Sequence, residues 1–128
     1  MQNQTSGQEG ERLAGEYYEK LGYKIIGKNV RLHQYRQVGE IDLIVVQENS
    51  QPKEIIFVEV KARRTEAFGS PADAVGFYKS RKLLRAIKLF LLQHPQYDTW
   101  THRIDVAEVR LDKTPPSVTI LVNVIEDY

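Results

Sequence analysis

The sequence contains no cysteine, so the chain can form neither disulfide bonds nor thiolate metal sites. This absence fits a reducing compartment. The sequence also lacks an apolar run of membrane-spanning length and an apolar leader segment. We therefore expect a cytoplasmic protein that has no membrane partner.

Several familiar catalytic and nucleotide-binding motifs are missing as well. There is no P-loop, no dinucleotide fingerprint and no Ser/His/Asp nucleophile constellation. The three histidines, His33, His94 and His102, lack the spacing of metal ligands. We interpret them as surface or capping residues, and a zinc site is not expected.

Length and composition are those of one ordinary globular domain. The chain has 128 residues, 41% of them hydrophobic and 27% charged, which is enough for a real core. No repeat, linker or low-complexity tract divides it. We expect a single domain over residues 1–128, with a flexible polar start at residues 1–9.

The net charge of +1 is too small to indicate a partner, but the charges are unevenly distributed. Residues 61–93 carry eight Lys or Arg and two acids, whereas residues 104–128 carry two basic and five acidic residues. One side of the helix predicted in the first segment carries Arg81, Lys82, Arg85 and Lys88. A basic block beside carboxylates is typical of a surface that follows a phosphate backbone, but the solvated face of an amphipathic helix has the same pattern.

A β-hairpin is predicted over residues 39–61. Both halves are rich in β-branched residues, and the connector between them is polar and turn-like. If residues 47 and 54 close the loop, Asp42 lies opposite Glu59, because paired residue numbers in an antiparallel ladder have a constant sum.

The same register sorts the hairpin side chains into two faces. Glu40 then lies opposite Lys61, and both share a face with the two acids, because strand side chains alternate. The other face would hold Ile41, Leu43 and Val45 together with Ile56, Val58 and Val60.

Two carboxylates opposite each other across a ladder repel by about 0.2–1 kcal/mol, and by more if partly buried. A cation between Asp42 and Glu59 would remove this cost, and Mg²⁺ suits the pair because it takes one or two carboxylates together with water and phosphate oxygens. Lys61 could orient a water or neutralise phosphate charge there. The alternative is an exposed polar face on which Glu40 and Asp42 pair with Lys61, because Glu-x-Lys is a weak motif alone.

The whole pattern predicts an α/β fold. Helices are predicted over residues 10–21 and 70–93, a polar loop over 33–38, and strands over 23–32, 39–46, 53–61, 103–111 and 118–124. The order α-β-β-β-α-β-β gives a central mixed sheet covered by helices, with a crossover through the long helix.

Several motifs occur together in the order of a known family. They are Gly10–Ala14, Lys28–Arg31, Gly39–Ile44, Phe57–Arg63, Phe68–Pro71, Lys79 and Arg103–Val106. With them the sequence resembles the YraN-type uncharacterised bacterial family, which is similar to archaeal Holliday-junction resolvases within the PD-(D/E)xK nucleases. The resemblance implies the restriction-endonuclease-like fold, with three α/β/α layers.

The resemblance also implies roles for individual residues. Asp42, Glu59 and the Val60 carbonyl would hold Mg²⁺, or Mn²⁺, and Lys61 would position the attacking water. Glu11, an acid that the helix dipole alone would explain, becomes a metal-proximal acid. Contacts to the DNA backbone would come from Arg63, Arg64, Lys79, Arg81, Lys82 and Arg85. Asp105 matches a family position, but an acid that pairs with a nearby Arg explains it equally well.

Three functions remain open from the sequence. The first is a Mg²⁺-dependent endonuclease acting on branched or structured DNA, for which a homodimer is expected because junctions are two-fold symmetric. The second is a nucleic-acid-binding module of the same fold that cuts nothing. The third is a protein-interaction scaffold.

Overall fold

The computed structural model describes residues 5–64 and 77–122, without the side chains of residues 77–80. Its elements follow the predicted order, with a short 3₁₀ helix added before the fourth strand. They are α1 (Ser6–Lys20), β1 (Lys24–Gln34), β2 (Arg36–Gln47), β3 (Glu54–Arg63), α2 (Phe77–Gln93), η2 (Pro95–Tyr97), β4 (Thr101–Arg110) and β5 (Ser117–Leu121).

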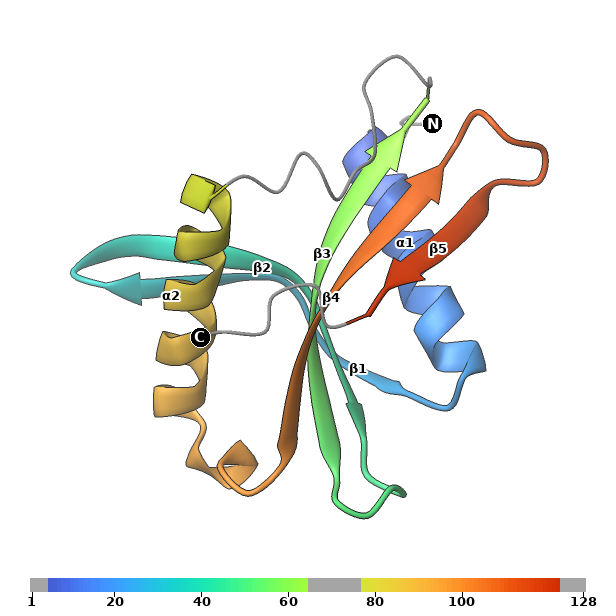
Figure 1. Cartoon of the computed structure of the whole chain (residues 1–128). Helices are drawn as coiled ribbons and strands as arrows, with labels where there is room; N and C mark the ends of the chain where they lie inside the picture. Colours follow the sequence, from blue (N-terminus) through green and yellow to red (C-terminus); the bar gives the residue numbers. More distant parts are fainter. Residues whose placement is uncertain (1–4, 65–76, 123–128) are drawn as a thin grey trace.

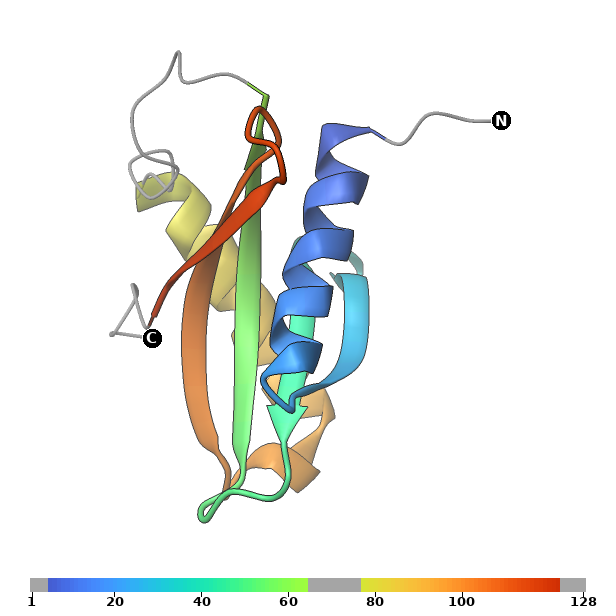
Figure 2. The ribbon, with the colours of Figure 1, turned by 90° about the vertical axis from the view of Figure 1, so that its right-hand side faces the viewer.

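The five strands form one mixed sheet between two helices. The strand order is β1-β2-β3-β4-β5, and only the β3–β4 pair is parallel, as the crossover through α2 requires. The two helices lie on opposite sides of the sheet (Figures 1 and 2). Each helix closes its own core cluster: Ala14 and Tyr18 of α1 pack on one face, and Ile87 and Phe90 of α2 on the other. This is the three-layer arrangement that was predicted.

The register of the β2–β3 hairpin is confirmed for residues 43–47 and 54–58, but the predicted pairs of Asp42 with Glu59 and of Glu40 with Lys61 lie beyond the end of this ladder and are not formed. Leu43 pairs with Val58 and Gln47 with Glu54, so the residue numbers sum as predicted. The run Ile55–Val58 is buried on both faces, so Glu59 is the residue that opposes a slip: a shift by one residue would turn it towards the apolar cluster under α1. The β2–β3 ladder ends at Leu43, and beyond this residue β2 continues with β1 as its only paired strand.

The prediction that Ile41 shares a face with Leu43 is wrong. Ile41 belongs to the core cluster under α2, whereas Leu43 belongs to the cluster under α1. Residues two apart in a regular strand face the same side, so the alternation is interrupted at Asp42. There a side chain replaces the backbone ladder, because Asp42 Oδ2 accepts a hydrogen bond of 2.8 Å from the Val60 amide.

The predicted loop over residues 33–38 is also wrong. β1 runs on to Gln34 and β2 begins at Arg36, so only Tyr35 turns the chain. The resulting hairpin arm, residues 30–41, extends beyond β3 and lies beside α2 (Figure 1). Gly39 permits the contact, since a Cβ there would lie 3.0 Å from both the Lys82 carbonyl oxygen and the Ala86 Cβ.

The helix boundaries differ from the prediction at one end. α1 begins at Ser6, so residues 6–9 of the stretch expected to be flexible are helical. Thr5 explains the earlier start, because its side chain and that of Gln8 form a reciprocal capping box. The start predicted for the second helix at residue 70 lies outside the described residues, whereas its end at Gln93 is confirmed. Within residues 5–64 and 77–122, no helix is long and apolar enough to cross a membrane.

Candidate functional site

Asp42 and Glu59 are the first residues beyond the end of the β2–β3 ladder, where the two strands separate. Glu59 follows the buried run Ile55–Val58 on the central strand and is itself only 5% exposed. Asp42 is fixed to the next residue of the same strand by its hydrogen bond with the Val60 amide. The end of the ladder therefore holds two carboxylates on neighbouring strands, one of them almost buried.

These acids line a small cavity between the sheet and α2. The acidic cavity has a volume of about 320 Å³ and is lined by Gln37, Gly39, Glu40, Asp42, Glu59, Lys82 and Leu83. Three of the four predicted hairpin side chains are thus brought together. The fourth, Lys61, lies beside Glu59, with its Nζ 3.5 Å from Glu59 Oε1.

The donor set suits a cation that is only partly ligated by protein. In the described part of the chain, no three His, Cys, Asp or Glu side chains are grouped to hold a metal ion. Asp42 and Glu59 therefore supply a carboxylate pair and not a closed cage. Mg²⁺ is normally held by one or two carboxylates with water and phosphate oxygens, so the pair fits this ion better than it fits Ca²⁺ or Zn²⁺.

Glu11, the predicted metal-proximal acid, is not among the residues that line the acidic cavity. Its Oε2 accepts a hydrogen bond of 2.9 Å from Asn29 Nδ2. Asn29 has a positive φ of 49°, a conformation that Asn adopts more readily than most residues. Glu11 therefore joins α1 to β1 in this structure.

The predicted nucleic-acid contacts separate into two places. Arg81, Lys82 and Arg85 are exposed on α2, and Lys82 also lines the acidic cavity. Arg63, half-buried, is the last residue of β3. Arg64 instead turns towards α1, where its Nε donates to Ser6 Oγ at 2.8 Å and its Nη2 lies 3.3 Å from Glu9 Oε2. Lys79 falls in the part of α2 whose side chains are not described.

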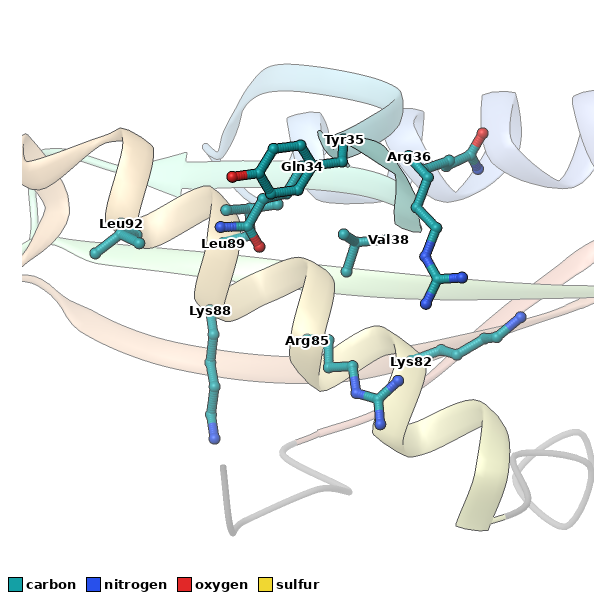
Figure 3. A pocket seen from close by; sticks show the side chains of 10 residues that line it. Gln34, Tyr35, Arg36, Val38, Lys82, Arg85, Lys88, Leu89 and Leu92 are labelled. Atoms are coloured by element: carbon teal, nitrogen blue, oxygen red, sulfur yellow. The ribbon is translucent and has the colours of Figure 1, made fainter.

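A larger groove, not predicted from the sequence, lies between the hairpin arm and α2 (Figure 3). This basic groove has a volume of about 950 Å³ and is lined by Gln34, Tyr35, Arg36, Gln37, Val38, Lys82, Arg85, Lys88, Leu89 and Leu92. Sequence reasoning missed it because residues 33–38 were assigned to a loop. Lys82 and Gln37 line both the groove and the acidic cavity, so the two are continuous.

Asp105 lies on the face of the sheet that α1 covers, opposite the acidic cavity, and its contacts there are structural. It is fully buried and accepts hydrogen bonds from Tyr18 Oη at 2.7 Å and from Arg103 Nε and Nη2 at 3.0 Å each. Arg103 also reaches Glu54 Oε2 at 3.4 Å, and Glu54 Oε1 accepts a hydrogen bond from Tyr23. The predicted pairing of Asp105 with an Arg is therefore confirmed, and the network joins α1, β3 and β4 beneath α1.

Burial of this network changes the acidity of its members. Burial raises the pKa of Tyr18 far above its ordinary value. The negative charge of Asp105 and the hydrogen bond to it raise this pKa further. Burial and the hydrogen bond to Glu54 raise the pKa of Tyr23 as well. For Arg103, burial lowers the pKa, but its contacts with Asp105 and Glu54 outweigh burial and raise it overall. Both tyrosines are therefore protonated in the folded protein and donate their hydrogen bonds.

Fold and site together define a class: an α/β protein with a carboxylate pair where two central strands separate, beside a basic groove. A family model described as uncharacterised protein family UPF0102 matches residues 10–109. The chain belongs to this family, which is the YraN-type family that its motifs resemble.

Relatives in this family match most of the chain. A UPF0102 protein of Caldanaerobacter subterraneus is 36% identical over 116 residues, covering 91% of this chain and 86% of the relative. UPF0102 proteins of Alkaliphilus oremlandii and Syntrophus aciditrophicus are 38% and 39% identical, covering 85% and 86% of this chain and 87% and 80% of the relatives. Because the family is described as uncharacterised, its name assigns no activity, and the function has to be argued from the site.

Proposed function

We propose that this protein is a Mg²⁺-dependent endonuclease that hydrolyses phosphodiester bonds in branched or otherwise structured DNA. The observation that carries the proposal is the acidic cavity, in which Asp42 and Glu59 meet at the end of the β2–β3 ladder, with Lys61 beside Glu59. The resemblance to PD-(D/E)xK nucleases gives these same three residues a catalytic role.

The metal ligands in this proposal are the carboxylates of Asp42 and Glu59 and the carbonyl of Val60. Mg²⁺, or Mn²⁺ in its place, supplies Lewis acidity and lowers the pKa of a bound water. The protein contributes by holding the two acids in place. Asp42 is anchored by the Val60 amide, and Glu59 is held on a strand whose preceding residues are buried. Such fixed ligands favour the placement within about half an ångström that a catalytic metal requires.

Lys61 is the only one of the proposed catalytic side chains that is cationic. Its Nζ is 3.5 Å from Glu59 Oε1, and its side chain is 21% exposed. From this position it can donate a hydrogen bond to the attacking water and neutralise charge that develops on the phosphate. The basic side chains of α2 would meanwhile neutralise neighbouring phosphates, which makes binding dependent on salt.

The test is cleavage of a labelled four-way junction and a matched linear duplex, in Mg²⁺, Mn²⁺ or EDTA. We expect metal-dependent cutting of the junction, lost in Glu59→Ala and Asp42→Asn. Glu16→Gln is the matched control, because this acid is exposed on α1, where it pairs with Arg12. Equal cutting by the Asp42→Asn protein would show that the activity belongs to a contaminant.

The second candidate is a nucleic-acid-binding module of the same fold that does not cut. The Glu59–Lys61 ion pair favours it, because a lysine compensates the charge of the buried acid without a metal. This candidate predicts salt-dependent binding and no metal-dependent product. Absence of any DNA or RNA affinity at low salt would leave a protein-interaction scaffold as the function.

A homodimer is part of the nuclease proposal, because a two-fold symmetric junction presents two equivalent strands. Sedimentation of the protein alone and on a junction tests this. A complex containing two chains per junction is the expected result, and a single chain on a saturated junction would contradict it.

A further inference from the structure

Tyr35 combines a strained backbone conformation with a side chain that is not packed against the described part of the chain. It has a positive φ of 69°, in the left-handed region that bulky L residues rarely adopt. Its side chain is completely exposed, at 107% of the reference area. A glycine or asparagine would make this turn more easily. A strained conformation that keeps an aromatic ring exposed is a feature of functional sites, and it favours a role for Tyr35 in binding.

The basic groove beneath Tyr35 has the chemistry of a nucleic-acid site. Among its described lining residues are four cations, Arg36, Lys82, Arg85 and Lys88, and no acid. The cations come from both walls: Arg36 from the hairpin arm and the others from α2 (Figure 3). A groove with cations on both walls complements a polyanion and would not attract an acid-poor peptide.

Apolar side chains in the same groove suit bases more than a bare phosphate chain. Val38, Leu89 and Leu92 line it, and Leu92 is 76% exposed. Proteins that bind single strands combine a cationic groove that follows the backbone with aromatic rings on which bases stack. A paired duplex keeps its bases stacked on each other, so a base is available to Tyr35 only where the nucleic acid is unpaired or splayed.

The groove also leads to the acid pair. Lys82 and Gln37 line both the basic groove and the acidic cavity. Tyr35 directly precedes β2, and Asp42 follows it by seven residues, at most about 23 Å at the rise of a β-strand. A strand held in the groove therefore passes from Tyr35 to the acids over a distance of a few nucleotides.

We propose that the basic groove binds a single-stranded segment of nucleic acid, with Tyr35 stacked on an unpaired base. Arg36, Lys82, Arg85 and Lys88 contact its phosphates. This inference rests on the proposed function for the cutting step and specifies its substrate class: DNA with an unpaired or splayed stretch close to the cleaved bond. Tyr35 and the basic groove then select DNA with an unpaired stretch, whereas the acid pair does not distinguish paired from unpaired DNA.

The test is a binding measurement in EDTA, so that no cleavage can occur. The probe is a DNA with one single-stranded arm that carries 2-aminopurine, a base whose fluorescence is quenched by stacking. We expect wild-type protein to quench the probe and Tyr35→Ala to bind it roughly 5- to 150-fold more weakly, as removal of one stacking contact predicts. Tyr35→Phe should keep both quenching and affinity. Tyr17→Ala, which removes a 37% exposed ring on α1, is the matched control and should bind like wild type.

The outcomes separate this inference from the nuclease proposal. Quenching that depends on Tyr35, in a protein that cuts nothing with Mg²⁺ or Mn²⁺, would support the groove and contradict the nuclease. Metal-dependent cutting with unchanged quenching and affinity in Tyr35→Ala would overturn the stacking inference and leave the nuclease intact. Equal affinity of Lys88→Glu and wild-type protein for the probe would overturn the groove as the binding surface.

Discussion

Asp42 ends the β2–β3 ladder and at the same time contributes to the acidic cavity. Its carboxylate takes the place of a backbone partner for Val60, and the strand side chains change faces next to it. An acid that was merely exposed on the strand surface would require neither this hydrogen bond nor the change of faces. The break in alternation, with Ile41 under α2 and Leu43 under α1, is therefore part of what brings Asp42 and Glu59 into one cavity.

The buried network around Asp105 gives a stability prediction. Tyr18→Phe removes the hydrogen bond to Asp105, a carboxylate with no exposed surface. We expect a loss of about 1.5–3 kcal/mol in the free energy of unfolding, the range for hydrogen bonds to charged groups. Urea unfolding followed by circular dichroism measures this. Tyr17→Phe is the control, because the neighbouring Tyr17 ring is partly exposed and should change stability by less than about 0.5 kcal/mol.

The same network predicts how stability depends on pH. Burial raises the pKa of Tyr18 and of Tyr23 in the folded protein, whereas in the unfolded chain both ionise near pH 10, the value for a free tyrosine. Their contribution is thus fully present below about pH 10 and is lost as the pH rises above it. We expect the free energy of unfolding to fall more steeply above this pH in wild type than in Tyr18→Phe. Equal slopes in both proteins would contradict the buried environment of Tyr18.

Substitution of Tyr35 is expected to raise the free energy of unfolding, in contrast to substitution of Tyr18. Tyr35→Asn should stabilise the protein by up to about 1 kcal/mol, because asparagine tolerates the left-handed turn and the exposed ring contributes no packing. The same variant should lose affinity for the single-stranded probe. A thermal melt of both proteins measures the first effect. A destabilised Tyr35→Asn would show that the ring supports the folded arm.

At the scale of elements, two glycines of α1 make a matched pair. A Cβ at Gly10 would lie 2.6 Å from Ala62 Cβ on β3, whereas a Cβ at Gly7 would meet only Thr5 Oγ1, at 3.9 Å. We expect Gly10→Ala to destabilise by about 1–3 kcal/mol through overpacking. Gly7→Ala should be neutral or stabilising by up to about 1 kcal/mol, from helix propensity. Denaturant unfolding of the two variants decides it, and equal effects would contradict the close contact of α1 with β3.

The elements also show which features can be predicted from sequence. The β2–β3 register could be predicted from the polar connector and from the positions of Glu59 and Lys61. The apolar runs of both strands are buried on both faces and do not by themselves select one alignment. The tip of the hairpin arm could not be predicted, because residues 33–37 are exposed and no buried stripe marks them as strand. The first turn of α1 was missed for a similar reason, since Thr5 and Gln8 form its cap without any apolar periodicity.

The part of the candidate site that lies on β2 and β3 could be predicted from the sequence, but the basic groove could not. Asp42, Glu59 and Lys61 were expected close together from the register, and they lie near one another just beyond the end of that ladder. The basic groove needs the position of α2 relative to the arm, and this depends on long-range packing such as the close contact of Gly39 with Ala86. Charge alone did not predict the position of Arg64: it was expected to contact DNA, but its side chain contacts α1.

For the whole molecule, charge distribution predicts a salt dependence. Cations from the hairpin arm and α2 face one groove although the net charge is only +1. Affinity for single-stranded DNA should fall with salt, and Lys82→Ala or Arg85→Ala should each reduce the slope of log affinity against log salt by about 0.7. Lys24→Ala, an exposed cation at the start of β1, is the control. A slope that changes equally in all three variants would show that binding is not confined to the groove.

The proposed nuclease requires that Asp42 and Glu59 form a divalent cation site. Binding of Mn²⁺ to the purified protein, followed by electron paramagnetic resonance of the free ion, tests it without assuming any activity. We expect saturable binding by wild type and by Glu16→Gln, competition by Mg²⁺, and loss of binding in Asp42→Asn and Glu59→Gln. Binding that survives in both of these variants, or no binding by wild type, would contradict it.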